Sequence, residues 1–183
     1  IEEESDDLTI RPERLDEFVG QVPVKESLKI AIEAAQKRDE PVDPAFWRTR
    51  LQAAAAMRET LKLEPETTAY RLVFAESDLV PGLIVDHYGD WLSVQFLTLG
   101  VDARRELLTE LMQELWAPRG IVERSDAAER KREGLPLRAG LVAGAAPPAD
   151  FEVLEHGLRF PVDLLGGQKT GFYVDQRENR RIA

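Results

Sequence analysis

The chain has 183 residues, 43% of them hydrophobic and 32% charged, which suits a globular protein with one well-buried domain and an appendage, or with two small units. Its net charge of -10 argues against broad non-specific nucleic-acid binding, because contacts to phosphates depend on Lys and Arg. Without cysteine, the chain has no disulfide, zinc-thiolate site or cysteine nucleophile, and its two distant histidines argue against a transition-metal site.

The N-terminal sequence IEEESDD is acidic and lacks the basic region of a signal peptide. No apolar run approaches the roughly 20 residues that a membrane span requires. We therefore expect a cytoplasmic protein with neither a membrane nor a metal ion as partner.

Residues 1–43 form a first unit, which ends where Pro41 and Pro44 interrupt one helical pattern and begin another. Within it, residues 10–21 predict an irregular extended segment, and residues 23–38 predict a helix with one modest apolar stripe. Such a short unit buries little apolar area, so it must pack against something else or be marginally ordered.

The second unit changes to alternating strand and helix patterns. Two β-rich runs joined by Gly89 and Asp90 give a strong hairpin signal, and Pro118 follows the end of the clearest helix. Residues 139–150 are rich in Gly, Ala and Pro and predict a loop. The expected elements, in chain order, are a helix at 46–62, strands at 70–75, 83–88 and 91–97, a helix at 102–116, a strand at 120–124, and a hairpin of strands at 151–155 and 158–163. This order predicts an α+β fold with a small, mainly antiparallel sheet, packed helices and a preceding helical segment.

The segment GGQKTGFYVDQRENR, residues 166–180, is the strongest candidate site. A Gly-Gly pair lets a backbone approach a ligand closely, and charged and hydrogen-bonding side chains follow it within a few residues. These side chains are Lys169, Thr170, Asp175, Gln176 and Arg177. The alternative interpretation is a helix-start cap with an inter-domain salt bridge.

The RPERLDEFVGQ sequence at residues 11–21, the helix after it and the EAAQKRDEPVD sequence at 33–43 resemble the N-terminus of the RuvB Holliday-junction motor, an AAA+ ATPase. The resemblance implies that Ile10 and Arg11 would touch the adenine of ATP. The family's next feature is a GxxxxGK[ST] phosphate loop, which this chain lacks. We therefore expect neither ATP hydrolysis nor branch migration, and DNA is a partner only if this alternative holds.

The second unit resembles the central region of class I S-adenosylmethionine (SAM)-dependent large-subunit rRNA cytosine-5 methyltransferases of the RlmI type. The resemblance spans residues 45–183 and rests on three ordered sequences: AYRLVFAESDLVPGLIVDHYGDWLSVQFLT, IVERSDAAERKREGL and LLGGQKTGFYVDQRENR. It implies a central domain of strand-strand-helix-strand-strand type at 44–165 and the start of the catalytic domain at 166–183. It further implies SAM as cofactor, rRNA as partner and a SAM-side role for the residues after Gly167.

Family members also carry an N-terminal PUA domain and a C-terminal catalytic domain with a catalytic cysteine, none of which is found in this chain. We therefore expect a methyltransferase fragment that positions RNA, is inactive alone and has no catalytic residue of its own, joined to the RuvB-like segment as a chimera. The alternatives are a RuvB-like helicase fragment and a non-catalytic fusion or interaction module.

Three further groups of residues have alternative interpretations. The segment 123–126, with Arg130 and Arg132 after it, could contact rRNA phosphates or brace the catalytic domain, but a strand end with exposed charges is favoured. Asp86 and His87 are adjacent in a strand and point to opposite faces, so hairpin surface is favoured over an acid-base pair. The tryptophans could stack RNA bases or pack in the core. For Trp116 we favour the core, whereas Trp91 is left open.

Overall fold

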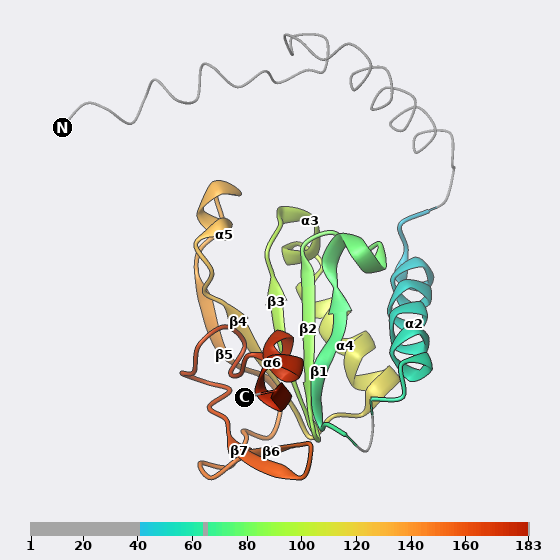
Figure 1. The fold of residues 1–183 in the computed structure, drawn as a ribbon. Coiled ribbons are helices and arrows are strands. Elements are labelled where there is room, and N and C mark those ends of the chain that lie inside the picture. Colours follow the sequence, from blue (N-terminus) through green and yellow to red (C-terminus); the bar gives the residue numbers. More distant parts are fainter. Residues whose placement is uncertain (1–40, 64–65, 183) are drawn as a thin grey trace, which may run out of the picture. The chain divides into compact units, whose positions relative to one another are not determined.

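A five-stranded sheet lies at the centre of the part of the chain that the computed structural model describes, residues 41–63 and 66–182 (Figure 1). The chain divides into two compact units, residues 1–41 and 42–183. The expected helix at 23–38, and with it Ile10 and Arg11, lies outside the described residues. Everything below concerns the second unit.

The sheet has the order β1-β2-β3-β4-β5, and every neighbouring pair is antiparallel except the parallel pair β3 and β4. The strands are β1 (Ala69–Phe74), β2 (Leu83–Tyr88), β3 (Trp91–Phe96), β4 (Gly120–Ser125) and β5 (Arg138–Gly144). A parallel pair needs a crossover connection, and the helices between β3 and β4 provide it. The expected α+β class with a mainly antiparallel sheet is confirmed.

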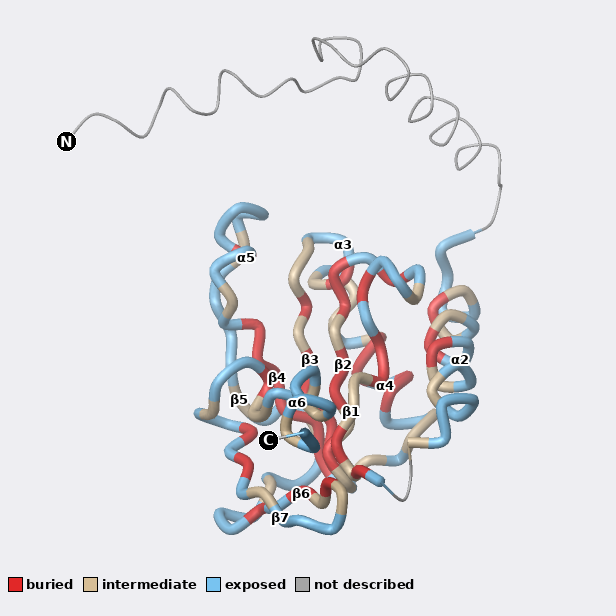
Figure 2. The backbone as a smooth tube through the Cα atoms, in the orientation of Figure 1, coloured by how far each residue is buried: buried red, intermediate tan, exposed pale blue. Residues whose placement is uncertain are grey.

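Helices cover one face of the sheet and enclose the larger core. The helix α2 (Pro44–Thr60) begins at Asp43, whose side chain accepts a hydrogen bond from the Phe46 amide at 2.9 Å. The crossover consists of α3 (Leu99–Asp102) and α4 (Arg105–Trp116), so the single helix expected at 102–116 begins at 105 and is preceded by a separate short one. Apolar side chains of α2 and α4 meet alternate residues of the strands, which is why the middle of the sheet is buried (Figure 2).

The C-terminal part of the chain covers the other face. It comprises the hairpin β6 (Glu152–Glu155) and β7 (Leu158–Pro161), the turn η2 (Val174–Gln176) and the helix α6 (Arg177–Ile182). A second core forms here from Ala69, Tyr88, Trp91, Val122, Phe151, Val153, Val162 and Leu164. Trp91 is therefore a core residue, and its indole nitrogen donates a hydrogen bond to the Ala145 carbonyl at 3.0 Å.

Two expectations about residues 125–150 were wrong. Residues 138–144 form the edge strand β5 where a loop was expected, because an exposed strand of small residues shows no alternation of apolar and polar side chains. Arg130, in the short helix α5 (Glu129–Arg132), is fully buried although its neighbours are charged and exposed. Its guanidinium donates hydrogen bonds to the carbonyls of Phe96 and Pro136 and pairs with Asp102 at 2.9 Å.

Among the described residues, no helix is long and apolar enough to cross a membrane.

Candidate functional site

The candidate segment begins with a turn that its own residues close. The Asp163 carboxylate accepts hydrogen bonds from the amides of Leu165 at 3.0 Å and Gly166 at 2.8 Å, and the Asp163 carbonyl accepts one from Gly167 at 2.9 Å. A Cβ atom on Gly167 would lie 2.4 Å from the Asp163 carbonyl oxygen. The turn itself therefore requires glycine at 167, and close approach of a ligand is not needed to explain it. We call residues 163–176 the C-terminal loop.

Thr170 fixes the C-terminal loop to the sheet. Its side chain is 1% exposed, and its hydroxyl donates a hydrogen bond to Asp86 Oδ2 at 2.6 Å. Because that proton is committed to the carboxylate, the 2.9 Å contact with the Tyr88 hydroxyl has Tyr88 as the donor. Tyr88 also lies 3.3 Å from the Phe172 carbonyl. The loop thus depends on two neighbouring same-face residues of β2.

Asp86 is fully buried and binds Arg71 as well as Thr170. The guanidinium of Arg71 donates two hydrogen bonds to the carboxylate, at 2.9 Å from Nε and 3.1 Å from Nη2. Burial works to lower the pKa of Arg71, but the hydrogen bonds and charge of Asp86 outweigh it and raise the pKa. Burial, and after it the charge of Asp86, raises the pKa of the Tyr88 phenol well above its ordinary value. Both groups therefore keep their protons at neutral pH.

Two more arginines attach the C-terminal part of the chain to the strands, one before and one after Thr170 in the sequence. Arg124, 5% exposed, donates from Nη2 to the Gly167 carbonyl at 2.7 Å. Arg180 in α6 binds the buried carboxylate of Glu155 with two hydrogen bonds, of 2.7 and 2.8 Å. The hydrogen bond that Arg180 donates to Glu155 is the largest cause that raises the pKa of Arg180. The C-terminal loop is thus attached to β2 and β4, and the helix α6 after it is attached to β6, in each case through a buried charged side chain.

The five residues predicted as a SAM-side group do not share one environment. Lys169 and Asp175 form an ion pair at 2.9 Å, with the lysine ammonium above the Tyr173 ring, and this pair lowers the pKa of Asp175. Gln176 is exposed and accepts a hydrogen bond from Asn179 at 2.6 Å, while Arg177 pairs with its neighbour Glu178 at 3.3 Å. Thr170 alone is buried. The charged contacts of Lys169, Asp175 and Arg177 are thus local within the described residues.

The expectation of exposed charges was wrong for several strand residues. Asp86 is a buried anchor and not hairpin surface, and Glu123 is 2% exposed, 3.4 Å from Arg105. Ser125 accepts a hydrogen bond from the Phe96 amide at 3.0 Å. The alternation in β2 contained a usable signal, because Asp86 and Tyr88 share one face while Val85 and His87 share the other. The alternation could not show which residue they bind: the partner of Asp86 is Thr170, 84 residues away in the sequence.

The side chains of this segment differ in how well they suit direct contact with a cofactor. Thr170 does not fit a direct contact, since its hydroxyl is buried and used within the chain. Lys169, Asp175 and Gln176 fit better, because they are exposed on one short stretch of loop and offer both charges and an amide. No group of three or more His, Asp or Glu side chains in the described part of the chain could hold a metal ion.

Comparison with known proteins gives two different relationships. The ribosomal RNA large subunit methyltransferase I of Tolumonas auensis is 48% identical over 148 residues, which are 80% of this chain and 37% of that protein. Most of this chain is similar to ribosomal RNA large subunit methyltransferase I. The Aliivibrio fischeri protein of that name is 41% identical over 146 residues, with the same shares covered. The chain thus spans little more than a third of the length of these relatives.

Solved structures share the fold. A Streptococcus mutans structure assigned as a SAM-dependent methyltransferase superposes with a TM-score of 0.67 at 23% identity, over 79% of this chain and 36% of that one. A structure of an assigned methyltransferase complexed with SAH gives the same TM-score at 24% identity, over 78% and 36%. At such identities the likeness concerns the fold alone.

The beginning of the chain has another relationship. A family model described as the Holliday junction DNA helicase RuvB P-loop domain matches residues 10–50. Both resemblances stated from the sequence are therefore confirmed, and their coexistence supports a chimeric chain. The RuvB match extends into α2, where Trp47 is buried in the larger core.

Proposed function

We propose that the second unit is the central region of a SAM-dependent rRNA methyltransferase, which positions RNA and transfers no methyl group by itself. The observation that carries this proposal is the 48% identity to ribosomal RNA large subunit methyltransferase I over 80% of the chain. In this proposal, residues 44–165 are an accessory domain and residues 166–183 begin the catalytic domain. The target is a cytosine of large-subunit rRNA, and the protein is cytoplasmic.

SAM would supply an electrophilic methyl group, and the C-terminal loop would form one edge of its site. Lys169, Asp175, Gln176 and Arg177 are the side chains proposed to face the cofactor, because they are polar and not fully buried. Thr170 has a different role from the one first expected. It holds the loop on β2 through Asp86, so that the exposed side chains keep their positions.

A domain exchange tests the proposal. The segment of the Tolumonas auensis enzyme that aligns with this chain is replaced by residues 44–183, and methyl transfer from radiolabelled SAM to undermodified large-subunit rRNA is measured. We expect the exchanged enzyme to retain activity and the 183-residue chain alone to have none. Turnover by the chain alone, or an exchanged enzyme that folds but cannot methylate, would refute the proposal.

The loop is tested in the same exchanged enzyme. Lys169→Ala and Gln176→Ala should raise the KM for SAM with a smaller change in kcat, because they remove contacts that form on binding. Arg159→Ala is the control, since this exposed side chain lies on the β6–β7 hairpin and outside the C-terminal loop. An unchanged KM for SAM in both loop variants would exclude them from the cofactor site.

The RuvB match does not lead us to propose an ATPase. It covers residues 10–50, and no GxxxxGK[ST] sequence occurs in the 183 residues to hold nucleotide phosphates.

A further inference from the structure

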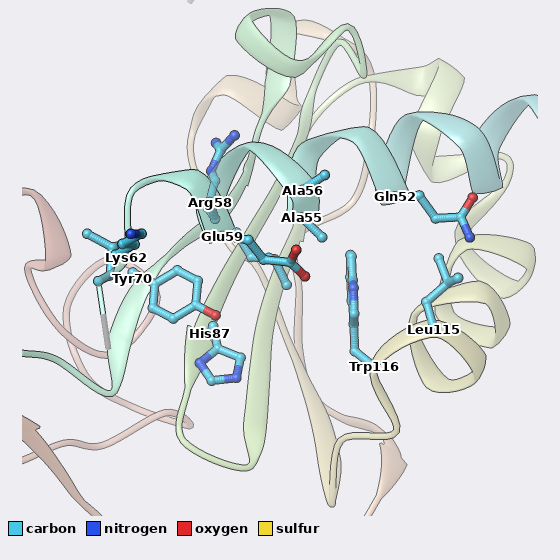
Figure 3. A pocket seen from close by; sticks show the side chains of 12 residues that line it. Gln52, Ala55, Ala56, Arg58, Glu59, Lys62, Tyr70, His87, Leu115 and Trp116 are labelled. Atoms are coloured by element: carbon cyan, nitrogen blue, oxygen red, sulfur yellow. The ribbon is translucent and has the colours of Figure 1, made fainter. Parts of the chain in front are cut away.

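A groove of about 740 Å³ opens on the helix-covered face of the sheet, between the end of α2 and the end of α4 (Figure 3). The groove and the C-terminal loop lie on different faces of the sheet, because successive side chains of β2 point to opposite sides. Asp86 and Tyr88 bind Thr170 of the C-terminal loop on one side of the sheet, whereas His87 lines the groove on the other. The groove is therefore separate from the proposed cofactor edge.

The floor and one wall of this groove are aromatic. Tyr70 of β1 and His87 of β2 lie opposite each other in the strand register, and their rings stack at 4.7 Å with an interplanar angle of 23°. Trp116, at the end of α4, stands across from this pair with its ring seen edge-on in Figure 3. All three side chains are partly exposed, so each of them presents some surface to solvent.

The rim of the groove is polar. Gln52 contributes an amide, and Lys62 and Glu59 contribute one charge of each sign. Arg58 also lines the groove, but its guanidinium is bound to Asp78 by two hydrogen bonds of 2.6 Å and turns away from the aromatic floor (Figure 3). The rim thus has no excess of carboxylates, although the whole chain carries a net charge of -10.

We propose that this groove binds an unstacked nucleobase of the RNA substrate, outside the nucleotide that is methylated. Proteins bind single-stranded RNA by stacking its bases on aromatic side chains and by hydrogen bonds to the base edges, and the groove combines both kinds of group. Its volume falls within the range of small-ligand pockets. The inference rests on the proposed function, since it names where that RNA is held.

Tryptophan fluorescence tests the groove in the 183-residue chain. Trp47 and Trp91 are buried, so a base that stacks in the groove should quench Trp116 selectively. The probes are a short oligouridine and an abasic oligomer of the same length, at one fixed salt concentration. We expect the oligouridine to quench the fluorescence and to bind at least about fivefold more tightly than the abasic strand, the lower bound for one stacked base.

Variants locate the binding. Trp116→Leu and Tyr70→Leu should each weaken oligouridine binding by about fivefold or more, measured by fluorescence anisotropy of a labelled strand. Gln52→Ala and Lys62→Glu test the same groove at exposed positions where folding is not at risk. Gln113→Ala is the matched control for Gln52→Ala, because Gln113 is an exposed α4 residue outside the groove.

Equal affinity for the oligouridine and the abasic strand would overturn the inference, as would unchanged binding in folded Trp116→Leu and Gln52→Ala variants. The inference would also be overturned if a protein segment occupied the groove and added RNA did not quench the tryptophan fluorescence. The domain-exchange assay decides the proposed function independently. An exchanged enzyme that methylates rRNA equally well with and without Trp116→Leu would refute the groove alone.

Discussion

Replacing Thr170 by valine should release the C-terminal loop from the sheet. Valine has nearly the shape of threonine, so the main effect of the substitution is to remove a hydroxyl whose partners stay buried. Two contacts are lost: the 2.6 Å hydrogen bond to Asp86 and the 2.9 Å hydrogen bond from Tyr88. Asp86 keeps Arg71, but its fully buried carboxylate loses one of its partners.

The magnitude follows from the charge of Asp86. A hydrogen bond to a charged group contributes about 1.5–3 kcal/mol, and Tyr88 retains a longer contact to Phe172, so we expect the free energy of unfolding to fall by about 2–3 kcal/mol. In a domain of this size that corresponds to a Tm lower by about 4–12 °C. Thr170→Ser keeps the hydroxyl and loses one methyl group, which should cost about 1 kcal/mol.

The assay has two readouts. Thermal unfolding followed by circular dichroism gives the stability of the wild type and the two variants. Limited trypsin digestion reports the loop directly, because Lys169 lies next to the substituted residue and cleavage there requires local opening. We expect faster cleavage at Lys169 in Thr170→Val than in Thr170→Ser. A valine variant as stable as the serine variant, with equal cleavage rates, would refute the anchoring role of the hydroxyl.

Three further predictions concern the same face of the sheet. Arg180→Met should lower the free energy of unfolding by about 2–3 kcal/mol, because it leaves the buried Glu155 carboxylate without its ion-pair partner. The double variant with Glu155→Met should be more stable than Arg180→Met alone. Urea unfolding of all four proteins in a double-mutant cycle measures the coupling between the two side chains, and simple additivity would contradict this prediction. The folded-state pKa of Tyr88 lies above the ordinary value of about 10, so this residue's contribution to stability is complete below pH 10 and declines as the pH rises toward the folded pKa. The free energy of unfolding of the wild type, measured by urea titration, should therefore fall more steeply above pH 10 than that of Tyr88→Phe, by about 1.4 kcal/mol per pH unit. Parallel curves would argue against a buried phenol. Gly167→Ala should lower the free energy of unfolding by at least about 1 kcal/mol, measured by thermal unfolding, because its Cβ would lie 2.4 Å from a carbonyl oxygen. Gly100→Ala is the control: its Cβ meets no atom within 4 Å, so it should be neutral or slightly stabilising. Equal effects of the two substitutions would show that the turn is not constrained as described.

Regular alternation and helical periodicity were enough to predict much of the fold. The hairpin at Gly89 and Asp90 follows from turn chemistry, and the helices at 44–60 and 105–116 follow from apolar residues spaced three or four apart. The edge strand β5 was missed, since it has small residues and is exposed on both faces. A strand without a fully buried residue shows no alternation to detect.

The sequence marked residues 166–180 as a distinctive polar segment, but it could not show what each side chain in that segment contacts. Thr170 and Lys169 are neighbours of similar polarity, yet one is buried beneath the loop and the other is exposed. The difference depends on Asp86 and Tyr88, which are more than 80 residues away. Arg130 illustrates the same point, since nothing in a run of charged residues tells which side chain will reach three carbonyl and carboxylate groups inside the protein.

The sequence by itself determined the local elements, the two family resemblances and the position of the polar loop, because each depends on residues close together in the chain. Only the tertiary structure decided which charges are buried, which glycines the turn requires, and that the two faces of β2 serve different surfaces. Those properties arise from contacts between distant residues, whose free energy depends on what surrounds each side chain and not on the side chain alone.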